Sequence, residues 1–325
     1  MKQQRLYGPM GSRMKQHLEL RRSLGFIYRS AEYVLHEFDQ YLANNFPSSQ
    51  IISRQMITGY LDTIRHKHPM TLSGKVGILR QFCRFMFQFD TNTYIPEKGL
   101  VSRGPVQIKP HIFTEAEINN LIKHVSSLHG NIKLLPETYR TIIGLLWVTG
   151  MRIGEVVNLK IDDVDTNNGI IYVRQTKFFK SRMLPLSEST NQALIKYKQQ
   201  RLNYSYSEAP GTPFFYNDRG KPCLRATTAT TIKGLIIQSG IKTFQGKTPR
   251  VHDIRHSFAT RWLLDFYQSG KDPTAYLATL ATYMGHASIA NTQVYLHPSI
   301  ELLNIASNQV QTYILSTGEN NETRK

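Results

Sequence analysis

Between Arg13 and Asp90, apolar residues recur at helical spacing between short polar breaks, and this pattern predicts four helices. The segment Ser30–Phe46 opens on a serine, a residue type that caps helix N-termini. Leu79–Phe89 is rich in Phe and Arg, and we interpret its aromatic stripe as core packing, because apolar periodicity reports burial more often than base stacking.

The helical pattern lapses from Thr91 to Lys109, where two Pro and two Gly interrupt a stretch without any period. Such a composition is typical of an extended linker. A chain of 325 residues is long enough for two domains with separate cores. We therefore predict an N-terminal helical domain with its linker over residues 1–105 and a second domain over residues 106–325.

The second half mixes two periodicities. Thr114–Leu128 and Glu137–Thr149 read as helices, the second stopping at Gly150. Gly169–Leu186 holds two short β-type runs around a polar turn and predicts a hairpin. The expected fold is mainly α with a small antiparallel β-sheet. Further helices are predicted at Thr190–Leu202, Ala226–Gln238, Val251–Gln268 and Leu302–Leu315.

Composition narrows the class of partner. Lys and Arg number 40 against 23 Asp and Glu, which gives a formal charge of +17. Because this charge is spread along the chain and not gathered in a basic tail, it favours nucleic acid as the partner over an acidic protein or a membrane surface. Cys83 and Cys223 have no metal-type spacing and fit a reducing cytosol. The longest apolar run, Ile142–Val148, is far short of a membrane span. A cytoplasmic location is expected.

Two local features could carry chemistry, although each has an ordinary explanation. Arg152, in Thr-Gly-Met-Arg-Ile-Gly-Glu, falls in the first turn of a new helix, where the macrodipole disfavours a cation unless an anion is present. Its ordinary explanation is a surface ion pair with Glu155. Lys177 lies at the tip of the hairpin, where a solvated turn lysine is usual.

Two further features lie near the C-terminus. In His-Asp-Ile-Arg-His, helical spacing puts His252, Arg255 and His256 on one face near a helix start, which suits a phosphate but is also met on any polar helix face. Tyr-Met-Gly-His ends at His286, and Tyr295 follows nine residues later. A lone tyrosine is usually a packed side chain.

Together these features meet the needs of phosphodiester transesterification. Two guanidiniums and a histidine can stabilise the charge on the phosphorus centre, an acid can protonate the leaving oxygen, and a hydroxyl can attack. This residue set requires no metal and no cofactor.

The set resembles the tyrosine recombinases, also called phage integrases. That family shows Arg in a Thr-Gly-x-Arg-x-x-Glu context, a hairpin Lys, His-x-x-Arg, Gly-His and a Tyr some nine residues beyond, and this chain shows all of them in that order from about Thr114 to Val310. The resemblance implies a mixed α/β catalytic domain. It also implies that the N-terminal helices form a SAM-like core-binding domain.

Roles follow from the resemblance. Arg152, Arg255 and His286 would hold non-bridging phosphate oxygens, Lys177 would protonate the departing 5′-oxygen, and His252 would help to deprotonate Tyr295. The product would be a 3′-phosphotyrosyl bond that a 5′-hydroxyl can reverse without ATP. Family members act on double-stranded DNA as tetramers holding two sites, and the Leu302–Leu315 segment is the candidate for the contact between protomers.

The hairpin departs from the family pattern. The family usually turns on Gly, whereas this chain has Phe178-Phe179, so the general acid is either Lys177 or Lys180. Lys177 is favoured because Arg182 and Leu184-Pro185-Leu186 then align with the family's second strand.

Three other classes of protein share part of this residue pattern. A zinc hydrolase would use His252 and His256 at i, i+4, but the intervening Asp253 and Arg255 do not suit that site. A type IB topoisomerase shares the chemistry, and a non-catalytic DNA-binding protein shares the charge. Target sequence and biological direction stay open among integration, excision, transposition and dimer resolution, with a mobile element favoured.

Overall fold

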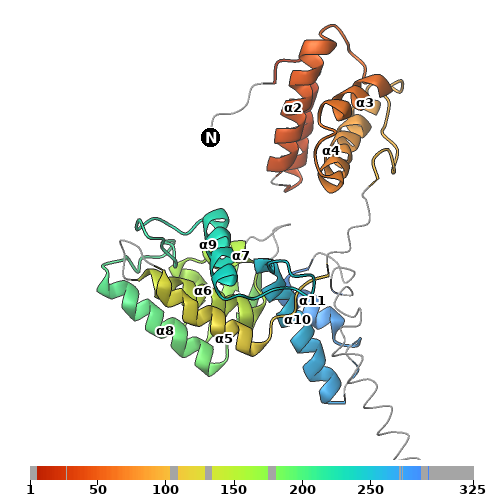
Figure 1. The fold of residues 1–325 in the computed structure, drawn as a ribbon. Helices are drawn as coiled ribbons and strands as arrows, with labels where there is room; N and C mark the ends of the chain where they lie inside the picture. Colours follow the sequence, from red (N-terminus) through yellow and green to blue (C-terminus); the bar gives the residue numbers. More distant parts are fainter. Residues whose placement is uncertain are drawn as a thin grey trace, which may run out of the picture. The chain divides into compact units, whose positions relative to one another are not determined.

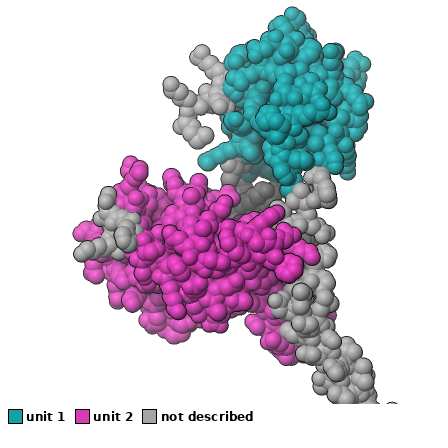
Figure 2. Space-filling model, viewed as in Figure 1, with its two compact units in different colours: residues 1–108 teal, residues 109–325 magenta. Residues whose placement is uncertain are grey.

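The computed structural model describes residues 6–26, 28–102, 109–128, 134–174, 181–270, 272, 274–286 and 292. The chain forms two compact units, Met1–Ile108 and Lys109–Lys325 (Figure 2). The boundary predicted after residue 105 lies three residues before this division. In the described part of the chain, no helix has both the length and the apolar character that crossing a membrane would require.

The described residues of unit 1 form the four helices expected from its apolar period (Figure 1). Ser53 caps the third helix by accepting a hydrogen bond from the Met56 amide, and Pro69 opens the fourth behind His68. The stretch Leu79–Phe89 is therefore not a separate helix but largely the second half of a longer one. The helices are α1 Gly11–Ser23, α2 Arg29–Asn45, α3 Arg54–Thr63 and α4 Pro69–Phe87.

The aromatic stripe of α4 divides between core and surface. Phe82 and Met86 are buried in the core of unit 1, as the core interpretation requires. Phe89, just beyond the helix, is 52% exposed, and the Arg13 guanidinium lies 3.9 Å from its ring centroid. The core interpretation thus holds for the inward positions and fails for the end of the stripe.

A buried histidine makes the stability of unit 1 depend on pH. His17 of α1 packs against the rings of Phe82, Phe85 and Tyr28, and neither ring nitrogen has a hydrogen-bond partner among the described residues. Burial, aided by the charge of Arg21, lowers the pKa of His17 to about 4. Because the unfolded chain takes up this proton near pH 6.5 and the folded chain only near pH 4, stability falls as pH falls through that window.

We expect the free energy of unfolding of unit 1 to drop by about 2 kcal/mol between pH 7 and pH 5, and His17→Phe to remove most of this drop. Urea unfolding followed by both far-UV circular dichroism and Trp fluorescence measures this drop. Because Trp147 and Trp262 both lie in unit 2, the circular dichroism transition that has no fluorescence counterpart belongs to unit 1. Equal pH dependence in wild type and variant would contradict the assignment to His17.

Unit 2 begins with two helices whose ends are set by local chemistry. Thr114 caps the first by a capping box: its hydroxyl accepts from the Glu117 amide at 3.2 Å, and a Glu117 carboxylate oxygen accepts from the Thr114 amide at 2.9 Å. The expected helix Thr114–Leu128 ends early and finishes in a 3₁₀ turn. The two helices are α5 Glu115–His124, followed by the turn η1 Val125–Ser127, and α6 Leu135–Thr149.

Helix α6 packs against α5, α7, α8 and α10, and α9 lies against α5, α7 and α10 (Figure 1). The four helices predicted between Glu137 and Gln268 are all present, and Val251–Gln268 is present with the predicted bounds. The helix predicted at Leu302–Leu315 lies outside the described residues. The helices are α7 Ile153–Val157, α8 Glu188–Asn203, α9 Arg225–Gln238, α10 Val251–Gln268 and α11 Leu277–Met284, with the 3₁₀ turn η2 at Ile161–Asp163.

A three-stranded antiparallel sheet of order β1-β2-β3 completes the unit. Ile171 pairs with Leu184, and both side chains are buried, which gives the period-2 pattern of the hairpin. The fold class, mainly α with a small antiparallel sheet, is confirmed. The two-residue β1 was not predicted, because so short a strand leaves no pattern. The strands are β1 Val164–Asp165, β2 Ile170–Val173 and β3 Arg182–Pro185.

Candidate active site

A glycine turn places Arg152. The chain leaves α6 through Gly150, whose φ of 59° is left-handed, and a Cβ there would lie 2.3 Å from a ring carbon of Phe258. Arg152 then becomes the N-cap of α7, one position before the first turn that the sequence predicted. Its amide donates to a Glu155 carboxylate oxygen at 2.9 Å, which fixes the start of the helix.

The Arg152 guanidinium is held on two sides and remains accessible. Its Nη1 donates to Glu155 at 2.8 Å, and its Nη2 donates to the Gly285 carbonyl at 2.9 Å. The ion pair with Glu155 exists, but it is not a surface pair, because the Glu155 side chain is only 9% exposed. The Arg152 side chain is 37% exposed, so a bound anion could reach it.

Arg255 projects from α10 and is buried. Its Nη1 donates to the Gly150 carbonyl at 2.6 Å, and its Nη2 donates to the Met284 carbonyl at 2.7 Å. These bonds join the ends of α6 and α11 to α10. The predicted guanidinium is therefore fixed by backbone groups that come from distant parts of the sequence.

His252 and His256 lie one turn apart at the start of α10, with their rings edge to face and 5.0 Å between centroids. Partial desolvation, followed by the charge of Arg255, lowers the pKa of His252. His252 is consequently neutral at pH 7 and able to accept a proton.

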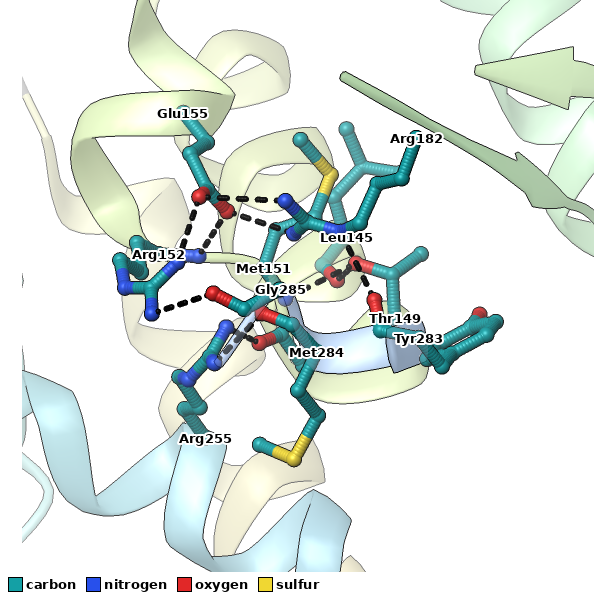
Figure 3. A network of polar contacts seen from close by, with 11 residues as sticks. Leu145, Thr149, Met151, Arg152, Glu155, Arg182, Arg255, Tyr283, Met284 and Gly285 are labelled. Carbon is teal, nitrogen blue, oxygen red and sulfur yellow. Dashed lines mark hydrogen bonds and ion pairs between the residues drawn. The ribbon is translucent and has the colours of Figure 1, made fainter. Parts of the chain in front are cut away.

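The end of α11 is the meeting point of the site. Gly285 ends the helix in the left-handed conformation, with φ 67°. The three successive carbonyls of Tyr283, Met284 and Gly285 accept hydrogen bonds from Arg182, Arg255 and Arg152 respectively (Figure 3). Three guanidiniums from three elements thus surround one turn.

His286 follows directly on that turn. Its amide donates to the Ala281 carbonyl, and its Nδ1 lies 2.7 Å from the hydroxyl oxygen of the buried Thr292. Desolvation, followed by the charges of Arg255 and Arg152, lowers the pKa of His286 to about 4. The imidazole is therefore neutral at pH 7. When the Thr292 hydroxyl donates to Nδ1, the His286 Nε2 carries the proton and can donate to an anion.

The structure brings four of the six predicted site residues into unit 2 near this turn: Arg152, Arg255 and His286 are linked through it, and His252 stands on the same helix as Arg255. Lys177 and Tyr295, together with Lys180, lie outside the described residues. Among the described residues, no group of three His, Cys, Asp or Glu side chains gathers in the manner of a metal site.

Two residues of the network were not given these roles from the sequence. The sequence pattern indicates Glu155 only as an ion-pair partner of Arg152, and Arg182 only as a marker of strand alignment. In the structure, Arg182 Nη2 donates to Glu155 at 2.8 Å, so one carboxylate serves two guanidiniums. Arg182 follows the hairpin lysines on the chain, and that position was the only sequence signal for it.

The arrangement suits a tetrahedral oxyanion. Three guanidiniums and one carboxylate surround the turn, which gives a net charge of +2 among Arg152, Arg182, Arg255 and Glu155, and the carboxylate is paired with Arg152 and Arg182. A neutral imidazole that can donate a hydrogen bond stands beside them. Fixed donors of this kind stabilise charge that develops in a transition state without having to reorganise.

Comparisons with known proteins agree with this chemistry. Residues 111–301 match the phage integrase family. The chain is 32% identical to the putative integrase/recombinase y4rB of Sinorhizobium fredii over 92% of this chain and 96% of the relative, and 29% identical to the tyrosine recombinase XerC of Lactobacillus delbrueckii subsp. bulgaricus over 81% and 84%.

Solved structures share the fold. The Tn1549 transposon integrase in complex with transposon right end DNA matches with a TM-score of 0.64 and 17% identity, over 92% of this chain and 99% of that one. A lambda integrase dimer bound to a core site matches with a TM-score of 0.61 and 17% identity, over 87% and 76%.

Proposed function

The chain belongs to the phage integrase family, and from this membership we propose that it is a site-specific recombinase that cleaves and rejoins DNA through a covalent bond to Tyr295. The relatives named above are integrases and tyrosine recombinases, so the enzyme class is DNA strand breakage and rejoining. The observation that carries the proposal is the convergence of Arg152, Arg255 and His286 on the α11 turn.

In the proposed reaction, Arg152, Arg255 and the neutral His286 hold the two non-bridging oxygens of the scissile phosphate. Their positive charge and N–H groups stabilise the five-coordinate phosphorus. A buried Arg255 between backbone carbonyls cannot swing away, so the site is organised before DNA arrives.

The steps balance without ATP. The Tyr295 oxygen forms a bond to phosphorus while the bond to the 5′-oxygen breaks. His252, whose lowered pKa leaves it unprotonated at pH 7, accepts the phenol proton, and Lys177 gives a proton to the departing 5′-oxygen. A 5′-hydroxyl from another strand then attacks the 3′-phosphotyrosine, releases Tyr295 and restores a phosphodiester.

Unit 1 is proposed to be a core-binding domain, so that both units bind double-stranded DNA. Four helices and the basic balance of the chain support this role. The solved relatives include a lambda integrase tetramer bound to a Holliday junction. We propose the same assembly here, a tetramer on two DNA sites, with Leu302–Leu315 as the contact between protomers and the cytoplasm as its location.

The biological role proposed is movement of a mobile element by integration, excision or transposition. Two relatives that are 32% and 30% identical to this chain are named integrase/recombinase, which favours this role over resolution of replicon dimers. Strand exchange between the ends of the element that carries the gene would support it.

A suicide substrate tests the reaction. The protein first selects a binding site from a pool of random duplexes. A nick just 3′ of the cleavage position lets the short fragment that carries the new 5′-hydroxyl diffuse away, which traps the adduct. We expect a protein–DNA adduct on the 3′-phosphate strand that forms equally well in EDTA. Relaxation of a plasmid that lacks the selected site would instead indicate a topoisomerase.

The hairpin lysines differ in one measurable respect. If Lys177 is the general acid, Lys177→Ala slows cleavage of ordinary DNA by about 100-fold or more, within the range for acid–base catalysis, and Lys180→Ala does not. A substrate with sulfur in place of the 5′-bridging oxygen restores the rate of Lys177→Ala, because a thiolate leaves without a proton. Rescue of Lys180→Ala instead would assign the acid to Lys180.

A further inference from the structure

We propose that Arg182 is a positioning residue of the recombination site, which holds Glu155 and the α11 turn so that Arg152 and His286 keep their places. This inference rests on the proposed function and gives a role to Arg182, which the sequence analysis uses only to align the second strand. Arg182 would act through its neighbours and not by touching DNA.

The donors of Arg182 are directed at protein groups. Its Nε donates to the Tyr283 carbonyl at 2.7 Å, while Nη2 and Nη1 reach the two Glu155 oxygens at 2.8 and 3.3 Å (Figure 3). The side chain is only 9% exposed, against 37% for Arg152. All three nitrogens of the Arg182 guanidinium donate to protein groups, so it serves as a fixed support, whereas Arg152 keeps an accessible surface for the phosphate.

Glu155 passes this support to Arg152. Its carboxylate accepts from Arg182 on one side and from Arg152 Nη1 and the Arg152 amide on the other. Burial alone would raise the pKa of Glu155, but the hydrogen bonds and charge of Arg182, followed by the hydrogen bonds from the Arg152 amide and side chain, lower it. The carboxylate therefore stays ionised between the two cations, and loss of Arg182 would remove two of the four hydrogen bonds that it accepts from these arginines.

Arg182 also supports the turn at the end of α11. Arg182 is one of the three arginines that hold successive carbonyls of Tyr283, Met284 and Gly285, and His286 follows directly. The fit is close: a Cβ at Gly285 would lie 2.6 Å from Arg182 Nη1. Arg182 is also the first residue of β3, the second strand of the hairpin, so its hydrogen bond to the Tyr283 carbonyl connects the hairpin to the α11 turn.

The test compares two buried arginines of unit 2. Arg182→Lys keeps the positive charge, but an ammonium cannot bridge a carbonyl and both carboxylate oxygens as a guanidinium does. Arg201→Lys is the matched control, since Arg201 has no exposed side-chain surface and binds Glu208 and the Pro213 carbonyl away from the turn. Both variants lose the planar fork of donors, and only one loses the support of the site.

With the nicked substrate at saturation, we expect Arg182→Lys to lower the single-turnover cleavage rate by roughly 10-fold or more with its Kd for DNA nearly unchanged, and Arg201→Lys to cleave as the wild type does. Combination of Arg182→Lys with Glu155→Gln should slow cleavage by less than the product of the two single effects, because both act through one carboxylate. A wild-type rate in Arg182→Lys, or fully multiplicative effects, would overturn the inference.

Amide hydrogen exchange in the DNA-free protein keeps this inference separate from the proposed function. The Gly285 and His286 amides donate within the turn, to the Thr282 and Ala281 carbonyls. Arg182→Lys should speed their exchange, and Arg201→Lys should not. Unchanged exchange refutes the support of the turn even if no DNA is cleaved. Faster exchange without any adduct from the wild type refutes the proposed function alone.

Discussion

Tyr295→Phe is expected to bind the selected DNA site with nearly wild-type affinity and to form no covalent adduct. The substitution removes one oxygen and no charge, because a phenol with a pKa near 10 is protonated at pH 7. The oxygen is the proposed nucleophile, so its loss is expected to abolish the chemical step and not merely to slow it. The measurement is the denaturing gel of the nicked substrate, with binding followed separately by a mobility shift.

Tyr276→Phe supplies the matched control for this experiment. Tyr276 lies next to α11, and its ring packs on Phe266 with 4.2 Å between centroids, a contact that phenylalanine retains. This variant should form the adduct as the wild type does. An adduct in Tyr295→Phe would show that another residue attacks the phosphate, and the assignment of the nucleophile would then be wrong.

Helices with chemical end signals could be predicted from the sequence. Thr114 with Glu117 and the left-handed Gly150 mark real helix ends, since caps act over a few residues and require no tertiary contact. The helix α11 was missed. Its sequence, LATLATYM, is short and offers little polar contrast, and its buried residues pack against α10, so tertiary contacts stabilise it more than local propensity does.

The candidate site likewise contains residues that could be predicted from the sequence and one that could not. The order of Arg152, Arg255 and His286 along the chain predicted a cluster, and the structure places all three around one turn. Arg182 could not be predicted as their support, because Glu155 lies 27 positions away and Tyr283 lies 101 positions away. No local spacing encodes such contacts. Lys177 and Tyr295 lie outside the described residues and stay predictions.

Arg255→Ala and Arg152→Ala are both expected to lower the single-turnover cleavage rate by about 100-fold or more, which corresponds to the loss of ~2.7 to 4 kcal/mol for one oxyanion donor. They should differ in stability. Removal of the buried Arg255 leaves the Gly150 and Met284 carbonyls without that partner and should lower the Tm, whereas the more exposed Arg152 should change it less. Rates are therefore compared below the Tm of each variant.

Arg261→Ala is the control for helix α10. Arg261 stands on the same helix as Arg255, but its guanidinium lies 3.9 Å from the Trp147 ring centroid. The arginines that donate to the carbonyls of Tyr283–Gly285 are Arg152, Arg182 and Arg255. If Arg255 acts on the scissile phosphate, Arg261→Ala should cleave nicked DNA close to the wild-type rate while Arg255→Ala does not. Cleavage by folded Arg255→Ala within about 10-fold of wild type, far less than the loss of an oxyanion donor allows, would mean that this guanidinium only joins three helices and that the phosphate is held elsewhere.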